Sequence, residues 1–199
     1  MASSDQMLHL ARRMTPAQAE RRERLREAAR GLACEGGYAA VTIRSVAERA
    51  GMSLATVYRY FSSKDHLIAE VHAYESRNLA GELAAHAPRG ATKAERAEDV
   101  FSRMLDEVVA NLNLSAAAVA AVTSGDPAAN GPEYWQELVM IPYLDAALGD
   151  ESAENREELA EILGHLLFSL MIGLTVGRLE LDKAKEIMGR TLRLVLRED

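Results

Sequence analysis

Residues 51–61 read GMSLATVYRYF, and they place three of the ten aromatic residues of the chain beside a single arginine. A glycine opens this stretch, and residues 42–50 before it repeat apolar side chains at helical spacing. Two short helices joined by a turn of about three residues that contains glycine form a helix-turn-helix. The stretch therefore predicts the turn and the second helix of such a motif.

The two faces of this second helix follow from a rotation of about 100° per residue. With Val57 taken as the inward direction, Phe61 and Leu54 lie within about 60° of it. Four residues then face outward or flank the outer face: Ala55, Thr56, Tyr58 and Arg59.

This outer face has the chemistry that a DNA major groove accepts. Alanine can touch a thymine methyl group, and arginine can donate two hydrogen bonds to guanine. Hydroxyl groups suit phosphate oxygens, and a lysine at a helix N-terminus can meet an anion there. The candidate DNA-binding residues are Thr42, Arg44, Ser53, Leu54, Ala55, Thr56, Tyr58, Arg59 and Lys64.

The charge of the chain is unevenly distributed around this motif. Residues 1–64 carry eleven Lys and Arg against six Asp and Glu, a formal charge of +5, whereas the remaining 135 residues carry −12. A basic head on an acidic body favours a polyanionic partner for the N-terminal part alone.

At this point the residues resemble the signature of the TetR family of transcriptional regulators. The resemblance rests on residues 46–47, 50–53, 55–58, 60–61 and 63–64, with Gly36, Gly37, Tyr38, Thr42 and Leu67. It covers residues 20–70, and the family position at Ala55 is more often glycine, which keeps the groove face equally open. The segment is also similar to actinobacterial regulators of lipid and steroid breakdown, and nineteen arginines against four lysines is typical of GC-rich bacteria.

The resemblance implies three N-terminal helices that bind DNA and a larger C-terminal domain with a ligand pocket and a dimer interface. The positions that match the DNA contacts of the family are Thr42, Arg44, Thr56, Tyr58 and Lys64, whereas Arg59 comes from the helix geometry alone.

Composition and punctuation residues predict an all-α fold of about nine helices. Alanine, leucine, glutamate and arginine are abundant, and aromatic residues make up only 5% of the chain. Capping boxes at Thr15 and Thr92 open two helices, and glycines at 36 and 37 end the first. We expect a flexible arm at 1–14, a helix-turn-helix domain at 15–64, a connecting helix and hinge at 65–90, and a ligand-binding and dimerisation domain at 91–199.

The last two predicted helices, about 152–180 and 182–197, are candidates for a homodimer interface. The first is apolar nearly all round, and such a helix needs burial on more than one side. Together they suit a four-helix contact between two copies, with Gly173 and Gly177 allowing close helix approach. An ordinary intramolecular core helix is the alternative.

The C-terminal helices also offer candidates for an effector site: Met104, Val108, Trp135, Met140, His165, Phe168 and Met171. Methionines at helical spacing are more often core residues than ligand contacts, and His165 amid leucines favours a hydrogen-bonded core histidine. The low polar content predicts a large apolar effector, such as a lipid, acyl or steroid-like metabolite.

Other function classes lack their motifs. We find no HExxH, no Ser/His/Asp cluster, no glycine-rich phosphate loop and no metal-ligand spacing, so the sequence predicts no enzyme, metal or cofactor. The alternatives are an enzyme or small-molecule binding protein with a vestigial head, and a constitutive architectural DNA binder, which the −12 body disfavours.

The predicted compartment is the cytoplasm. The N-terminus lacks the apolar run of a signal peptide. The longest apolar run, 162–176, is fifteen residues, shorter than the ~20 of a spanning helix. We therefore expect a soluble protein with no membrane partner, and the single cysteine, Cys34, agrees with a reducing compartment.

Overall fold

The computed structural model of the chain describes residues 14–131, 139–149 and 156–196. Within these ranges it contains nine helices and no strand, which confirms the predicted all-α fold. The predicted arm and Trp135 lie outside the described residues, except for Met14.

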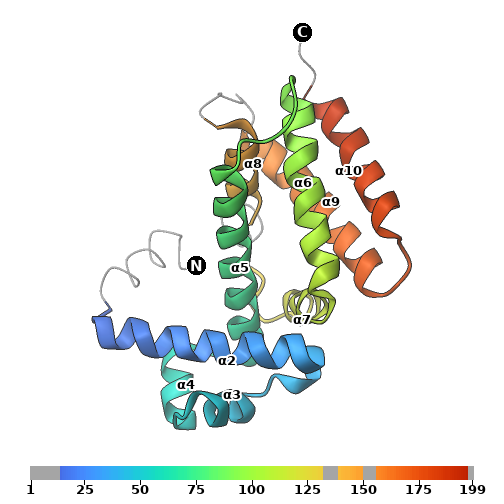
Figure 1. Ribbon diagram of the computed structural model, residues 1–199. Coiled ribbons are helices and arrows are strands. Elements are labelled where there is room, and N and C mark those ends of the chain that lie inside the picture. The colour runs from blue at the N-terminus through green and yellow to red at the C-terminus, as the bar shows by residue number, and fades with distance from the viewer. Residues whose placement is uncertain (1–13, 132–138, 150–155, 197–199) are drawn as a thin grey trace.

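The N-terminal helices form a flat layer from which a long helix rises (Figure 1). Helix α2 (Pro16–Ala40) lies across this layer, with α3 (Ile43–Ala50) and α4 (Leu54–Tyr60) packed along one side. Helix α5 (Lys64–Ala85) begins four residues after α4 ends and runs steeply away from α2. Helix α4, the second helix of the helix-turn-helix and called the reading helix below, is thus followed directly by the helix that connects the two parts of the molecule.

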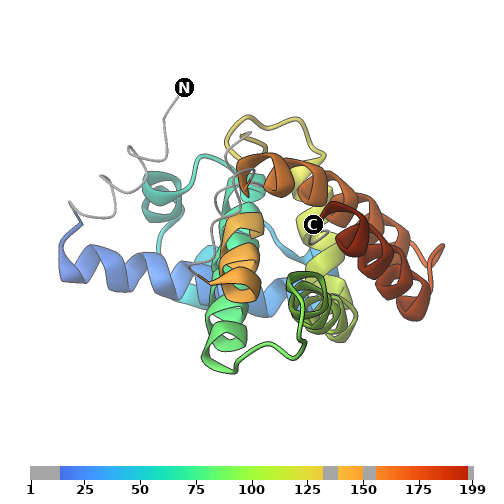
Figure 2. The same ribbon diagram turned by 90° about the horizontal axis from the view of Figure 1, so that it is seen from above.

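The C-terminal helices form a bundle that packs against the far part of α5 and extends to one side of it (Figure 2). Its members are α6 (Lys93–Ala110), α7 (Leu112–Val122), α8 (Ile141–Leu148), α9 (Arg156–Thr175) and α10 (Leu181–Val195). Helix α7 turns by 96° from α6 and packs on both α2 and α5. It therefore lies at the junction between the N-terminal layer and the bundle.

Capping residues set most of the helix starts, as the sequence predicts. Complete capping boxes form at Thr15, Thr42 and Thr92, in which each threonine oxygen accepts a hydrogen bond from a backbone N–H three residues on. Gly51 adopts the left-handed conformation (φ 65°) that the turn of the motif requires.

The buried side chains fall into two clusters. The N-terminal cluster is centred on Leu25, Val46, Val57 and Phe61, each with no exposed surface. The C-terminal cluster joins α6, α8, α9 and α10 with the far half of α5. Helix α7 contributes Leu114, Ala117 and Ala121 to the N-terminal cluster and Val122 to the C-terminal one.

Helix α9 ends earlier than the sequence predicts, at Thr175 rather than near residue 180. Its last turn closes when the Gly177 N–H donates to Leu174 O and Leu179 folds back against Gly173. Gly177 therefore lies beyond the end of α9, so it does not share a face of that helix with Gly173. By length and mean hydropathy (1.4) α9 could cross a membrane, but Leu163, Leu167 and Leu170 lie in the C-terminal cluster.

Candidate nucleic-acid interface

Helix α4 has one buried face and one exposed face. Val57 and Phe61 have no exposed surface, whereas Tyr58 is 58% exposed and Ala55 and Arg59 are also exposed. The division between these residues agrees with the faces derived from helix rotation. The exposed side offers a methyl group, a phenol and a guanidinium to a partner.

Leu54 does not lie inward as the helix rotation predicts. It is 49% exposed, because it is the first residue of α4 and lies at the end of the helix opposite to the Phe61 anchor. Its exposure keeps it among the candidate DNA-binding residues. Tyr60 packs half-buried on the N-terminal cluster, and the Arg59 guanidinium lies 5.2 Å from the centre of its ring.

The first turn of α4 is held by two neighbouring hydroxyl groups. Ser53 caps the helix by accepting from the Thr56 N–H (3.2 Å), and the two side-chain oxygens lie 2.9 Å apart. This pair fixes the start of the helix, and it also gives two hydroxyl groups a common position on the exposed side. While this hydrogen bond is made, one of the two hydroxyl groups keeps its proton free to donate to a phosphate oxygen.

Helix α3 is fixed against α2 by small side chains and one strong hydrogen bond. Val46, Ala47 and Ala50 are buried, and Arg24 Nη2 donates to the Ala50 carbonyl at 2.7 Å. A charged donor bonded to the last carbonyls of a helix is favoured by the helix dipole. The turn between α3 and α4 is therefore tied to α2.

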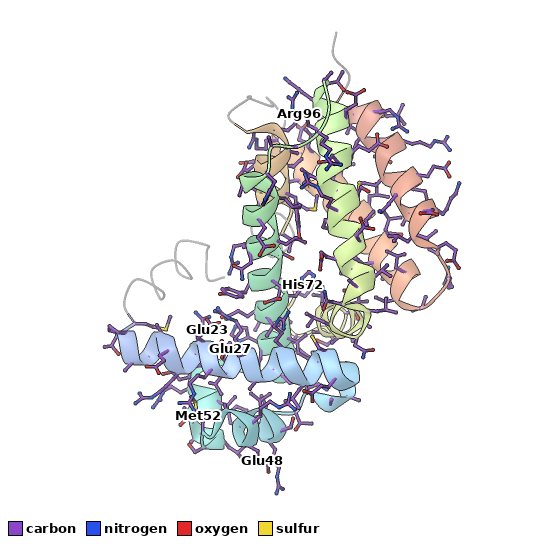
Figure 3. The ribbon with its side chains drawn as sticks, viewed as in Figure 1. Glu23, Glu27, Glu48, Met52, His72 and Arg96 are labelled. Carbon is purple, nitrogen blue, oxygen red and sulfur yellow. The ribbon has the colours of Figure 1, made fainter. Side chains whose placement is uncertain are left out.

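Thr42 and Arg44, the candidates at the start of α3, are both exposed. Thr42 is engaged as the N-cap of its own helix. The Arg44 side chain is 83% exposed, and its Nε donates to Glu48 Oε1 at 2.9 Å. Glu48 projects from α3 on the side away from α2 (Figure 3), so Arg44 must leave an exposed, weakly held pair to reach a base.

Lys64 lies at the first position of α5, as the sequence predicts. Two contacts at this helix start, one made by Lys64 and one by Ser63, were not predicted. Its Nζ lies 3.5 Å from the centre of the Tyr38 ring. The preceding residue, Ser63, caps α5 and donates its hydroxyl proton to Asp126. These partners come from the end of α2 and from the loop after α7, so no local pattern in the sequence could have identified them.

Two titratable groups at the start of α5 have altered pKa values. Hydrogen bonds from the Ser63 hydroxyl and the Ala128 N–H lower the pKa of Asp126. Burial lowers the pKa of His66, whose ring packs edge-on against Phe61 with centroids 5.6 Å apart. Near neutral pH, Asp126 is therefore anionic and His66 is uncharged at the start of α5.

An ionic network fixes α2 to α5 behind the reading helix. Arg22 bonds directly to Glu70, and Arg26 Nη1 lies 3.7 Å from the same carboxylate. The Arg26 guanidinium also stacks on Tyr74, 3.6 Å from its ring centre. Glu70 is only 9% exposed, so its charge depends on these two arginines.

Most of the candidate effector residues come together in the C-terminal cluster. Met104, Val108, Met140 and Met171 are buried there, and Phe168 packs against them. His165 is exposed on α9, so its predicted burial among leucines is wrong and it faces away from this group.

Three polar residues of the C-terminal interior were not anticipated. Ser76 is 6% exposed, and Tyr143 is 2% exposed with its pKa raised by burial. His72 lies on α5 where that helix faces the bundle (Figure 3), and burial lowers its pKa to about 4. Within the described ranges, no group of His, Cys, Asp and Glu could hold a metal ion.

The family comparison matches the N-terminal layer. Residues 25–71 match the family described as bacterial regulatory proteins, tetR family. This range contains α3, α4 and all nine candidate DNA-binding residues.

Relatives extend the similarity over most of the chain. The HTH-type transcriptional repressor KstR of Rhodococcus jostii is 29% identical over 181 residues, 90% of this chain and 84% of the relative. KstR of Mycobacterium tuberculosis is 27% identical over 181 residues, 90% of this chain and 82% of the relative. A solved TetR transcriptional regulator from Rhodococcus sp. RHA1 superposes with a TM-score of 0.80 at 26% identity, covering 90% of this chain and 97% of that one.

Proposed function

Because the chain belongs to the TetR family of bacterial regulatory proteins, we propose that it is a ligand-responsive repressor that binds a palindromic operator as a homodimer. Its relatives are named transcriptional repressors, so it is a DNA-binding regulator and not an enzyme. Because a repressor acts on DNA, the proposed compartment is the cytoplasm.

The exposed face of α4 carries the DNA-binding part of the proposal. Val57 and Phe61 anchor the helix, and Tyr58 and Arg59 between them are exposed on its other side. We assign base contacts to Ala55, Arg59 and Arg44, because guanidinium and methyl groups discriminate base edges. We assign backbone contacts to Thr42, Ser53, Thr56, Tyr58 and Lys64, with Leu54 as an apolar contact in the groove.

Exposed aliphatic side chains on the last two helices support the homodimer. Ile162 and Val176 on the α9 side are 52% and 58% exposed, and Leu194 on α10 is 61% exposed. Ile172 on α9 and Ile187 on α10 are half-buried. Aliphatic groups this exposed on adjacent helices favour burial against a second copy of the chain. The two DNA-binding domains of such a two-fold dimer would bind the two half-sites of a palindromic operator.

The C-terminal cluster supports an apolar effector, such as a lipid, acyl or steroid-like metabolite. Met104, Met140 and Met171 line the interior between α6, α8 and α9. Methionine side chains adapt to different shapes because they are unbranched and polarisable. The cluster also includes Tyr143, whose hydroxyl pairs with Ser76 and gives the interior hydrogen-bonding groups.

Two contacts could transmit a change in the effector-binding bundle to the DNA-binding N-terminal layer. Helix α7 packs in both clusters, so a shift of its C-terminal end moves the surface on which α2 rests. The loop after α7 places Ala129 in the C-terminal cluster and Asp126 on the cap of α5. An effector that separates α8 from α6 would act on both contacts and respace the two heads.

Selection of bound duplexes from a random DNA library tests the proposed function. We expect one palindromic sequence, bound with an affinity that falls steeply with salt. Tyr58→Phe should weaken binding to all sequences alike, whereas Arg59→Ala should cost about 1–3 kcal/mol and relax one base pair. If both variants bind like the wild type, the assigned face of α4 is wrong.

A thermal-shift screen tests the class of effector. Long-chain fatty acids, acyl thioesters and sterols should raise the melting temperature and release the selected duplex, because ligand binding stabilises the folded state by mass action. Shifts only with small charged metabolites would contradict an apolar effector.

A further inference from the structure

Tyr38 connects the end of α2 to the start of α5, beside the predicted DNA surface. The helical path of α2 is interrupted at Gly36 and Gly37, and Gly37 has φ 63° and ψ −157°, a conformation that favours glycine. This break carries Tyr38 towards the first turn of α5. Its ring then lies with its face 3.5 Å from the Nζ of Lys64.

The ring is held by a second contact at its other end. The Tyr38 hydroxyl donates to Asp65 Oδ1 at 2.7 Å. Burial and the neighbouring Asp65 raise the pKa of Tyr38 to about 12, so the phenol remains a donor wherever DNA is bound. The two contacts attach one aromatic ring to two consecutive residues of α5.

Asp65, the nearest acidic neighbour of Lys64 along the chain, bonds to Tyr38 and is not ion-paired with Lys64. Asp65 accepts from Tyr38, and Asp126 accepts from Ser63, so both carboxylates at the start of α5 already have partners within the protein. An ammonium group over a ring face is attracted by the ring but keeps N–H groups that point away from it. Those N–H groups remain available to an anion.

We propose that Tyr38 is a positioning residue for DNA binding, whose ring holds the Lys64 ammonium at the N-terminus of α5 in the place where it meets a phosphate. The inference rests on the proposed DNA-binding function and adds a residue to it. A free lysine loses side-chain freedom when it binds a phosphate. Contact with the ring removes part of that freedom before DNA arrives, so the phosphate contact forms at a lower entropic cost.

A double-mutant cycle on the full-length protein tests this role. The probe is the duplex selected by the wild type, and the dissociation constant is measured over a range of salt concentrations. Lys64→Gln should weaken binding and reduce the salt slope by about one, because one phosphate contact is lost. Tyr38→Leu should weaken binding about two- to fivefold, the fold-change of an exposed cation–π contact.

The decisive results are the coupling and the rescue. With Tyr38→Leu already present, Lys64→Gln should weaken binding less than it does alone. Tyr38→Phe keeps the ring and should therefore keep the wild-type salt slope. If the Tyr38 hydroxyl served DNA binding only by holding Asp65, Tyr38→Phe should change the slope. Tyr74→Leu removes the other close cation–π pair, that of Arg26, away from the DNA surface, and it should leave the slope unchanged.

Each other outcome overturns a defined part of the reasoning. Additive effects of the two substitutions, or tighter binding by Tyr38→Leu, overturn the positioning role while the proposed function stands. If the wild type selects no duplex, the proposed function fails and the positioning role fails with it. Urea unfolding of each variant identifies loss of folding, and Tyr38→Phe then decides the result.

Discussion

The N-terminal layer and the C-terminal bundle are packed with different kinds of side chain. Alanine is the most frequent buried residue of the N-terminal cluster, and hydrogen bonds such as those from Arg24 to Ala50 and from Arg22 to Glu70 fix its helices. The C-terminal cluster contains four buried methionines: Met104, Met140, Met171 and Met188. Small side chains and directed hydrogen bonds allow one arrangement, whereas methionines repack with little loss.

This difference matches what each region is proposed to do. A reading helix must present its side chains to base edges at fixed positions, so rigidity serves it. An interior that accepts an apolar effector must change shape, so adaptable side chains serve it. Substitutions that should affect one region and leave the other intact test this difference in packing.

The largest expected effect comes from the aromatic anchor of the N-terminal layer. Phe61 has no exposed surface, and Phe61→Ala should lower the free energy of unfolding by roughly 3–5 kcal/mol through lost burial and the cavity left behind. Urea denaturation followed by circular dichroism measures the change. Tyr58→Ala, at a 58% exposed position on the same helix, should change stability by less than about 0.5 kcal/mol. Equal losses in both variants would contradict the division of α4 into two faces.

The second effect concerns His72, a histidine of α5 that is partly shielded from solvent. Burial lowers the pKa of His72 from 6.5 to about 4. The unfolded chain therefore binds more protons than the folded one between these pH values, and stability falls as pH drops through this window. The loss amounts to up to about 3 kcal/mol between pH 7 and pH 4.

Unfolding measured against pH checks this prediction. His72→Gln should flatten the profile. The slope that remains should come from His66, whose pKa burial also lowers, and near pH 4 from glutamates such as Glu35 and Glu95, whose pKa values hydrogen bonds lower. His165→Gln, at an exposed position of α9, is the control and should keep the wild-type slope. A wild-type profile in the His72 variant would show that this histidine does not set the acid stability of the bundle.

Local signals in the sequence predicted the helices well, because capping is a short-range interaction. Thr15 and Thr92 begin helices as expected, and Thr42, Ser53 and Ser63 cap helices in the same way, each through a backbone N–H three positions on. The two faces of α4 followed from rotation alone, except at Leu54, where the helix begins.

The contacts that the sequence did not predict join residues far apart in the chain. Tyr38 meets Lys64, and Ser63 meets Asp126 across 63 positions. His165 was misplaced because α9 exposes aliphatic side chains such as Ile162 next to it, so hydropathy alone did not separate the exposed face from the buried one. Exposure of this kind is decided by which elements pack on a helix, and the pattern of one helix cannot give that.

The third effect tests the polar ties of the N-terminal layer. Glu70 joins Arg22 and Arg26 and is 9% exposed. Glu70→Gln should lower the free energy of unfolding by about 1–3 kcal/mol, less than for a fully buried network because Arg22 keeps 22% of its side chain exposed. Glu75→Gln breaks the more exposed pair with Arg30, at 2.7 Å, and should cost at most about 1 kcal/mol. If the two losses, measured by urea denaturation, are equal, burial does not set the strength of these ties.

The smallest expected effect on stability tests whether the two regions act independently. Asp126 belongs to the loop after α7, and it accepts the hydroxyl proton of Ser63 at the cap of α5. Asp126→Ala should lower the free energy of unfolding by only about 1 kcal/mol, because the carboxylate is partly exposed. Since hydrogen bonds lower the pKa of Asp126, this contribution is present above the ordinary pKa of an aspartate and is lost as pH falls below it.

The effect on communication between the regions should be larger than the effect on stability. Binding of the selected duplex to the head should slow amide hydrogen exchange in residues 124–131 of the wild type, because coupling between two sites acts in both directions. Asp126→Ala should abolish this protection, and Asp126→Asn, which keeps an oxygen that can accept from Ser63, should retain most of it. Protection that persists in the alanine variant would assign the coupling to α7 alone. The rigid head and the adaptable bundle would then communicate through apolar packing, and the polar link at the α5 cap would serve only to hold the helix end.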